Sequence, residues 1–397
     1  MRQTKSQQSL MNKPGNRLAL CLTLALSGSL AGCFSSSDSD SPGNGSDNGD
    51  NDTEYQAITL DATDSDQWTH LNLDNGEVVS AEQDWHIAAR RTDLKLNGGA
   101  SGEADVVGAL IQAQEDYYDD EGNPDPNIFL NRQADDELDT LLAEFDEPDD
   151  QDWYREHITN AFDDDWYLYD PASGNMEANS NLGWLVRGHD GESYAALVVE
   201  DFLFRTRAGE GVEAIEFDLR VQPAGASGFE QTFSLREDDG IIPASGGVVC
   251  FHFADNGGSS DCSSDDWDVQ LGFEGRDVFL RSNSGPSGPG QGGLFGPMDR
   301  DDLDEYQEAT YTPGGQSIAH HYSADTTGGV FAEHSWYAYN LEGRHQLWPN
   351  YRVYLIDSDE NQDDAPRYAL QVTDYYDDAG ESGHVSLRYR EAPGEDE

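Results

Sequence analysis

Alternating apolar and polar residues dominate the chain from residue 55 onward, and this pattern predicts short β-strands. Ile215–Val221 and Val385–Tyr389 carry apolar side chains at every second position, as expected for strands with one buried face. The apolar runs Tyr194–Val199 and Tyr368–Thr373 are also strand-like. Because glycine-rich turns separate these short runs, we expect an all-β fold, mainly antiparallel, of the sandwich or barrel type.

Helical periodicity is confined to an insertion in the first half of the chain. Apolar residues spaced i, i+3, i+4 and i+7 predict a short amphipathic helix that ends before Pro148; they are Leu138, Leu141, Leu142 and Phe145. The spacing of Trp153, His157 and Ile158 suggests a second helix. The predicted fold is therefore all-β with one or two short helices.

One pattern of motifs occurs twice along the chain. In both halves an Asp-Trp pair is followed by N-x-G-x-S-G and then by an aromatic Trp-Tyr segment. The matching segments are Asp84-Trp85 and Asp266-Trp267, Asn97–Gly102 and Asn283–Gly288, and Trp166–Asp170 and Trp336–Asn340. Landmarks repeated in one order argue for an internal duplication. We therefore predict two homologous domains, residues 55–235 and 241–393, joined near residues 236–240.

Residues 1–33 have the features of an export signal. Basic residues precede the apolar run Leu18–Leu26, which is too short to span a bilayer. Leu30–Cys33 resembles the lipobox of bacterial lipoproteins, in which the cysteine carries lipid and becomes the first mature residue. Residues 34–54 are rich in Ser, Asp, Asn and Gly, as a solvated tether should be.

The expected location follows from this segment. We predict a protein of the bacterial cell envelope, anchored through lipid on Cys33, and Phe34 after the cysteine favours the outer membrane. The alternative is a plain secretory signal with a chance cysteine at its end.

The charge of the chain limits its partners. It has 79 Asp and Glu residues against 22 Lys and Arg, a formal net charge of −57, and Lys95 is its only lysine after residue 33. So acidic a surface excludes nucleic acid and permits membrane contact only through a covalent anchor. It is typical of proteins in concentrated salt, which screens self-repulsion; an acidic protein from an ordinary habitat is the alternative.

The remaining cysteines predict one disulfide. Once the signal is removed and Cys33 carries lipid, Cys250 and Cys262 are left on either side of a turn-rich stretch. Two adjacent strands could hold them within disulfide distance, which fits an oxidising compartment. The alternative, a pair of metal thiolates, lacks the CxxC spacing and further ligands of a zinc site.

Several passages resemble the HmuY family of haem-binding lipoproteins. They are Trp85–Ala88 leading to Asn97–Gly99, and Tyr368–Tyr376 running on through Gly380 to Gly383–Val385. The similarity covers residues 55–100, 160–222, 248–290 and 330–392. It implies a lipid-anchored, mostly β protein that binds haem b for iron acquisition, and in some members passes it to an outer-membrane receptor. The duplication departs from the family's usual single-domain form.

Haem needs an apolar slot and one or two axial donors, normally His or Met. In the second copy, His320 or His321 could face His345 across the iron. We expect this copy to be the better haem carrier. In the first copy, His157 and Met176 form a weaker candidate pair. The alternatives are solvated loop histidines and, for His157, a hydrogen-bonded core histidine.

No motif indicates an enzyme. The chain lacks GxSxG, HExxH, the Walker loop and the dinucleotide fingerprint. One competing hypothesis is a surface adhesin or receptor-associated β-module that binds protein, glycan or calcium without haem, although acidic runs such as Asp116–Asp125 do not fit the EF-hand loop. Another is a mononuclear metal site that uses His320 and His321.

Overall fold

The computed structural model describes residues 55–205, 211–253 and 258–392. The signal segment, Cys33 and residues 34–54 lie outside the described residues. No helix of the described part is long and apolar enough to cross a membrane. The strands are mainly antiparallel and the helices short, so the predicted fold class is confirmed.

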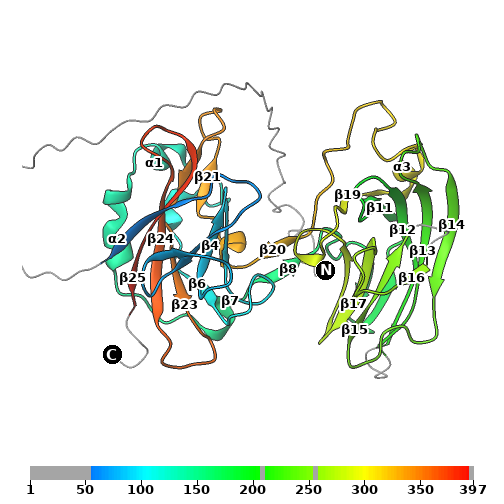
Figure 1. The fold of residues 1–397 in the computed structure, drawn as a ribbon, viewed down its shortest axis with the longest axis horizontal. Coiled ribbons are helices and arrows are strands. Elements are labelled where there is room, and N and C mark those ends of the chain that lie inside the picture. Colours follow the sequence, from blue (N-terminus) through cyan, green and yellow to red (C-terminus); the bar gives the residue numbers. More distant parts are fainter. Residues whose placement is uncertain (1–54, 206–210, 254–257, 393–397) are drawn as a thin grey trace, which may run out of the picture. The chain divides into compact units, whose positions relative to one another are not determined.

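One lobe is built from both ends of the chain, residues 55–156 and 329–392, and we call it the split lobe (Figure 1). Its main sheet has the order β1-β25-β24-β23-β6-β7, and a smaller sheet has the order β3-β2-β4-β5. The strands are β1 (Gln56–Asp61), β2 (Thr69–Asn72), β3 (Glu77–Val79), β4 (Ile87–Arg90), β5 (Asp93–Leu96), β6 (Val107–Gln112), β7 (Trp153–Tyr154), β21 (Tyr337–Tyr339), β22 (Leu347–Pro349), β23 (Val353–Asp357), β24 (Arg367–Tyr376) and β25 (Ser382–Glu391). The helices are α1 (Pro126–Phe129), α2 (Leu138–Leu142) and α4 (Val330–Glu333).

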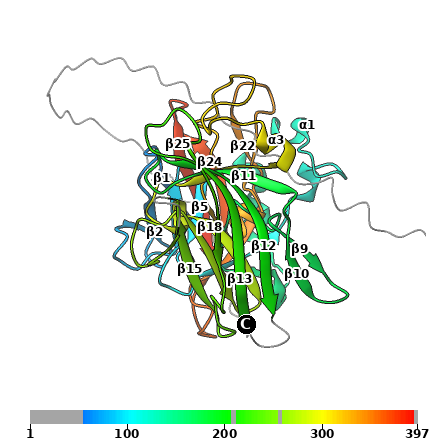
Figure 2. The same cartoon turned by 90° about the vertical axis from the view of Figure 1, so that its right-hand side faces the viewer.

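The other lobe is built from residues 160–325, and we call it the inserted lobe. Its main sheet has the order β14-β13-β12-β11-β19, and its smaller sheet β16-β15-β17-β18; β11, β12 and β13 face the viewer in Figure 2. Its elements are β9 (Tyr167–Asp170), β10 (Asn175–Ala178), β11 (Leu182–Arg187), β12 (Tyr194–Arg205), β13 (Gly211–Gln222), β14 (Gln231–Glu237), β15 (Gly247–His252), β16 (Gly258–Ser260), β17 (Val269–Glu274), β18 (Asp277–Ser282), β19 (Gly293–Asp299) and α3 (Arg300–Asp304).

The repeated motifs occupy matching places in the two lobes. Asn97 donates to the carbonyl of Trp85 at 2.9 Å, and Asn283 donates to the carbonyl of Trp267 at 2.8 Å. Each asparagine follows the last strand of a four-stranded sheet, β5 or β18. The order of strands in the two small sheets is also the same. The sequence pattern therefore corresponds to a repeated piece of structure.

Strand pairing corrects the predicted domain boundaries of 55–235 and 241–393. β1 pairs with β25 along six residues, and β6 pairs with β23, so the two ends of the chain share one sheet. Phe217 and Phe251, on either side of the predicted junction, belong to one core and lie 5.1 Å apart between ring centroids. Each lobe thus combines the first half of one sequence copy with the second half of the other.

Two short strands carry the chain between the lobes. β8 (His157–Thr159) leads into the inserted lobe, and β20 (Thr326–Gly328) leads out of it. They pair antiparallel, with Ile158 opposite Thr327. The helix suggested by Trp153, His157 and Ile158 is therefore wrong at His157, because β20 supplies a strand partner. Leu138–Leu142 is helical, as predicted.

Each lobe has its own aromatic core. Trp166, Trp184 and Phe217 are fully buried in the inserted lobe, and Trp336, Tyr354 and Leu387 in the split lobe. Burial of such side chains contributes about 1.5–3 kcal/mol each. Cys250 and Cys262 form the predicted disulfide, with Cα atoms 5.3 Å apart, and no matching cysteine occurs in the split lobe.

Candidate functional site

A pocket of about 490 Å³ in the inserted lobe contains both first-copy candidates, His157 and Met176. We call it the His–Met pocket. His157 comes from β8, Met176 from β10, and the facing side chains from the β17–β18 hairpin. Its lining also includes Tyr167, Arg276, Phe279 and Arg281. Its volume lies within the range of about 300–1,000 Å³ that is usual for cofactor pockets.

His157 is held by the β8–β20 ladder. Its Nδ1 lies 3.3 Å from the carbonyl oxygen of Arg155, and its ring lies over Gly328, the residue that pairs with it. A Cβ at Gly328 would come within 2.6 Å of Nε2. The glycine at position 328 therefore leaves room for the imidazole. Among the described residues Nε2 of His157 has no hydrogen-bond partner, so this nitrogen is available to bind a metal.

Met176 is the second candidate donor. It lies on β10 opposite Tyr169, is half-buried, and packs against the core of the inserted lobe. Tyr167 lines the same pocket, and burial, reinforced by Asp164, raises its pKa to about 12. Its hydroxyl therefore stays protonated at neutral pH.

Two guanidinium groups line the His–Met pocket and could pair with anionic groups of a ligand. Cζ of Arg281 lies 3.7 Å from the ring centroid of Phe279. Its Nε is buried, and no described residue accepts a hydrogen bond from it. Arg276 adds a second positive charge at the tip of the hairpin. Three carboxylates, Asp164, Glu274 and Asp277, also line the pocket, so two positive and three negative groups give its lining a formal charge of −1 with His157 neutral.

A second pocket, of about 710 Å³, is lined by residues of the split lobe and by Gly285, Pro286, Ala324 and Asp325 of the inserted lobe, and we call it the Trp–Lys pocket. Its lining includes Trp68, Arg90, Lys95, Trp336 and Tyr337. Lys95 lies two residues before Asn97, as Arg281 lies two residues before Asn283. Tyr337 follows Trp336 as Tyr167 follows Trp166. Matching residues of the repeat therefore contribute to both pockets.

The two donor positions differ between these pockets. Glu156 accepts a hydrogen bond from the backbone N–H of Leu96, and Asp325 accepts one from that of Ser282. Leu96 and Ser282 each precede the repeated asparagine, so Glu156 and Asp325 stand at matching positions. The residues that follow them, His157 and Thr326, therefore match as well. The β9–β10 and β21–β22 registers match Met176 with Leu347. Of these two matching residues, Thr326 lines the Trp–Lys pocket, whereas Leu347 is buried in the core of the split lobe.

A third pocket, of about 590 Å³, lies in the inserted lobe and contains His321. Met298, which the sequence analysis did not single out, lines it as well, with Phe295 among its apolar walls. Asp302 and Glu305 also line it, and no Arg or Lys does. This pocket could supply iron donors, but its charge disfavours an anionic ligand.

The second-copy candidates do not share a pocket. His345 is exposed on the β21–β22 turn of the split lobe, where Nδ1 lies 2.7 Å from the hydroxyl of Tyr339. His320 is exposed and His321 half-buried, and both belong to the inserted lobe. The exchange of halves between the lobes separates His345 from the other two, which the sequence pattern alone could not reveal.

Other histidines have structural partners. Nδ1 of His86 accepts the backbone N–H of Leu73 at 3.0 Å, and Nε2 of His334 lies 3.1 Å from the hydroxyl of Tyr154. His70 packs edge-on against Trp85. Burial lowers the pKa of all three histidines, which keeps them neutral near pH 7.

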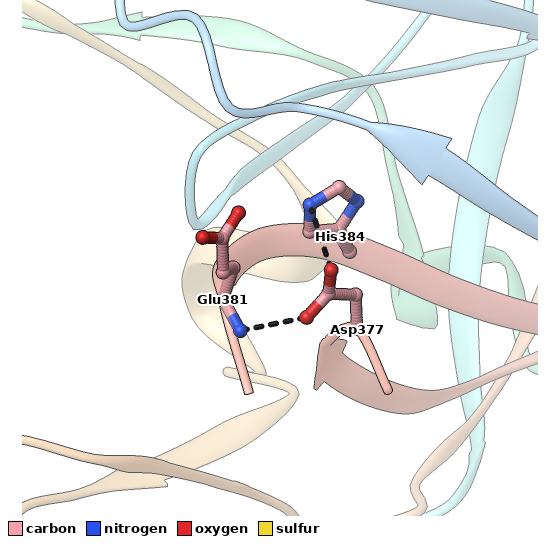
Figure 3. A group of neighbouring side chains, drawn as sticks. All are labelled: Asp377, Glu381 and His384. Carbon is pink, nitrogen blue, oxygen red and sulfur yellow. Dashed lines mark hydrogen bonds and ion pairs between the residues drawn. The ribbon is translucent and has the colours of Figure 1, made fainter. Parts of the chain in front are cut away.

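A separate polar group lies on the β24–β25 hairpin, where Figure 3 shows Asp377, Glu381 and His384. One ligand atom from each lies within 4.8 Å of the others. Asp377 also accepts the backbone N–H of Glu381 at 2.7 Å, and lies 4.0 Å from Nε2 of His384. A turn hydrogen bond and an ion pair account for this arrangement, so we assign no metal to it.

Residues 64–218 match the family model described as HmuY protein. These residues belong to the HmuY family. The matched segment runs from before β2 into β13 and includes both His157 and Met176. It crosses from the split lobe to the inserted lobe at β8. No curated protein matches the chain.

Solved structures similar to this chain come from three bacteria. An apo HmuY analog from Tannerella forsythia is 11% identical, with 86% of this chain and 96% of that chain covered and a TM-score of 0.28. A protein described as a HmuY-like haem-binding protein from Bacteroides vulgatus is 11% identical (85% and 91%, TM-score 0.27). One described as a lipoprotein from Bacteroides fragilis is 12% identical (86% and 92%, TM-score 0.27). Likenesses of this size do not locate a ligand.

Proposed function

We propose that this chain is a lipid-anchored protein of the bacterial cell envelope that binds haem b for iron acquisition and catalyses no reaction. The observation that carries the proposal is the His–Met pocket, where His157, Met176 and two arginines line one cavity. Imidazole and thioether are common axial donors to haem iron. The HmuY-family segment, which contains both donors, supports the same ligand.

Each part of the pocket suits one part of haem. Nε2 of His157 and Sδ of Met176 would hold the iron, and Phe279 and Tyr167 would flank the porphyrin. Arg276 and Arg281 would receive the propionates, and the unpaired Nε of Arg281 is a donor of the required kind. The chain has no CxxCH motif for covalent attachment, which favours haem b.

The cellular location and the protein partner are further parts of the proposal. Lipid on Cys33 would hold the protein at the outer membrane, with residues 34–54 as a tether. An outer-membrane haem receptor is the partner that would take up the cargo. The acidic surface would keep the folded part away from anionic lipid.

Haem titration of the purified protein tests this function. We expect saturable binding with a low-spin absorbance spectrum, lost or weakened at least tenfold in His157→Ala and in Met176→Ala, because each removes an axial donor. The control variants His345→Ala and His320→Ala/His321→Ala should bind as the wild type does. If the control variants lose binding while His157→Ala and Met176→Ala keep it, the His–Met pocket is not the haem site.

A further inference from the structure

The strand β6, near one edge of the main sheet of the split lobe, is paired on its outer side along only part of its length. It lies between β23 and β7, and β7 pairs only with Gly108 and Ala109. Beyond Ala109, Leu110 and Gln112 pair with β23 on the inner side. On the outer side, no described strand pairs with Leu110–Gln112. An open strand edge of this kind can pair with a strand of another chain.

A pocket of about 610 Å³ adjoins this open edge, and we call it the β6 groove. Leu110–Gln112 line one part of it, and residues 144–149 and Asp152 line the rest. Ile111 packs beside Leu141 in a small buried cluster, so the edge belongs to a packed part of the sheet. Three strand residues span about 10 Å. The groove therefore has room for a short stretch of extended chain along the open edge.

The lining of the β6 groove is acidic and contains no Lys, Arg or His. Its carboxylates are Glu144, Asp146, Glu147, Asp149 and Asp152. Glu147 pairs with Arg367, which lies outside the lining. The other four form no ion pair with any described residue. Uncompensated carboxylates beside a strand edge repel an acidic strand and attract a basic one.

This charge selects the occupant of the β6 groove. The chain has a formal net charge of −57, so a second copy would bring acidic groups against acidic groups at the edge. In a basic strand, alternate side chains point to the same face, and Lys or Arg at those positions would lie against the carboxylates. Backbone pairing with Leu110–Gln112 would supply affinity, and the charges would supply specificity.

The matching strand of the inserted lobe lacks this opportunity. β19 follows the hairpin that precedes Asn283, as β6 follows the one that precedes Asn97. β19 contains Pro297, which has no backbone N–H, and proline commonly protects strand edges from pairing. β6 has the sequence VGALIQ, with neither proline nor lysine. The two lobes therefore differ in whether this strand can accept a partner.

We propose that the β6 groove binds an extended segment of a partner protein that carries Lys or Arg at alternate positions and adds a strand to the split lobe at Leu110–Gln112. This interaction surface goes beyond the proposed haem site and does not depend on it, because the β6 groove shares no lining residue with the His–Met pocket. The carboxylates select the partner by charge, and the open edge orients it as a strand.

A short dye-labelled peptide of alternating Lys and Val tests this proposal, with binding followed by fluorescence anisotropy. We expect saturable binding of one peptide per chain, weakened at least tenfold in Asp146→Asn/Asp149→Asn. Both side chains are exposed, so this variant should fold. The control Asp363→Asn/Asp364→Asn removes the same charge from another exposed part of the split lobe. It should bind within twofold of the wild type, which separates the groove from the general attraction of an acidic surface.

A second peptide, with Pro in place of Val, separates strand pairing from charge. It has the same charge but fewer backbone N–H groups, so we expect it to bind at least tenfold more weakly. Hydrogen exchange should show protection of the backbone at Leu110–Gln112 with the Lys–Val peptide only. Haem titration of Asp146→Asn/Asp149→Asn should match that of the wild type, so failure of the haem site would appear separately.

Three results would overturn the proposal. Equal binding of the two peptides would mean that the β6 groove attracts any polycation. Equal binding by the two Asn variants, or no saturable binding at all, would mean that the carboxylates only protect the edge from other strands. Self-association of the chain that protects Leu110–Gln112 without peptide would identify a second copy as the occupant.

Discussion

The His–Met pocket and the Trp–Lys pocket share a framework and differ in their chemistry. Both are closed by the last hairpin of a four-stranded sheet, and both have a base at the same position of its final strand, Arg281 or Lys95. Only the first has candidate iron donors, on β8 and β10. Bases and aromatic walls are therefore shared by the two copies, whereas the proposed iron ligation depends on two side chains that differ between them.

Because each lobe combines halves of both sequence copies, the residues of the His–Met pocket come from both copies. The donors His157 and Met176 come from the first sequence copy, but Arg276 and Arg281 come from the second. Neither copy contains the complete His–Met pocket. A site of this kind requires both copies in one chain, so the predicted duplication and the proposed function are linked.

The strongest test transfers the donors from one pocket to the other. Thr326→His/Leu347→Met places an imidazole and a thioether at the positions that match His157 and Met176, and it should raise haem stoichiometry from about one to about two per chain. We expect a gain of 100-fold or more in haem affinity at that pocket, roughly 2.7 kcal/mol. Absorbance titration measures both quantities.

Two controls keep this test specific. Thr326→Ser/Leu347→Ile changes the same positions without adding donors and should leave the stoichiometry unchanged. Adding His157→Ala to the transfer variant should leave one haem with the spectrum of the new site. A transfer variant that folds but binds no second haem would contradict the equivalence of the two pockets.

The buried acids behind the bases predict a dependence of stability on pH. Burial raises the pKa of Glu156 from its ordinary value of 4.5 to about 7. Since the folded protein holds this proton more tightly than the unfolded chain, Glu156 costs no stability below pH 4.5. The free energy of unfolding falls as pH rises from 4.5 through 7, by on the order of 3 kcal/mol.

Glu156→Gln isolates this effect. The amide keeps an acceptor for Leu96 and can donate to Ser101, while it cannot ionise. We expect the variant to gain stability over the wild type above pH 7 and to match it at pH 4.5, measured by urea unfolding at both values. A difference that does not change with pH would contradict the assignment. Asp325→Asn should behave in the same direction, because burial raises the pKa of Asp325 too.

The disulfide distinguishes the two small sheets. Cys250 and Cys262 constrain β15 and the segment after β16, and the matching sheet of the split lobe has no bridge. Removing the bridge with Cys250→Ser/Cys262→Ser should lower the free energy of unfolding of the inserted lobe by about 3 kcal/mol. A reductant should destabilise the wild type similarly and leave the variant unaffected, as urea unfolding would show.

Local structure was predictable here, and long-range pairing was not. Alternation correctly located β13 and β25, because a strand with one buried face requires that period, and apolar runs correctly located β12 and β24. Nothing local in Gln56–Asp61 indicates that it pairs with β25 at the other end of the chain. His157 was assigned to a helix because its spacing fits one, while its strand partner lies at Gly328.

The candidate site was predictable in its members but not in its assembly. His157 and Met176 were recognised by their chemistry, yet the second copy was preferred because histidines on two facing loops could hold the iron from opposite sides. That preference did not take into account that each lobe combines halves of both sequence copies. This arrangement places His345 in a different lobe from His320 and His321. The arginines of the His–Met pocket were missed, since they stand about a hundred residues from the donors. The internal repeat could have indicated Arg281, because Lys95 and Arg281 occupy the same position in the two copies.

The smallest expected effect concerns Trp166 and Trp336, two core tryptophans at matching positions in the two lobes. Nε1 of Trp336 donates to the carbonyl of Thr92 at 3.1 Å, whereas Nε1 of Trp166 is buried with no partner among the described residues. Trp336→Phe leaves a carbonyl unsatisfied, and Trp166→Phe removes an unsatisfied donor. We therefore expect Trp336→Phe to cost about 1–2 kcal/mol more than Trp166→Phe, measured by urea unfolding followed by circular dichroism. Equal costs would mean that water or a shifted backbone satisfies Trp166, and the two cores would then be equivalent in this respect.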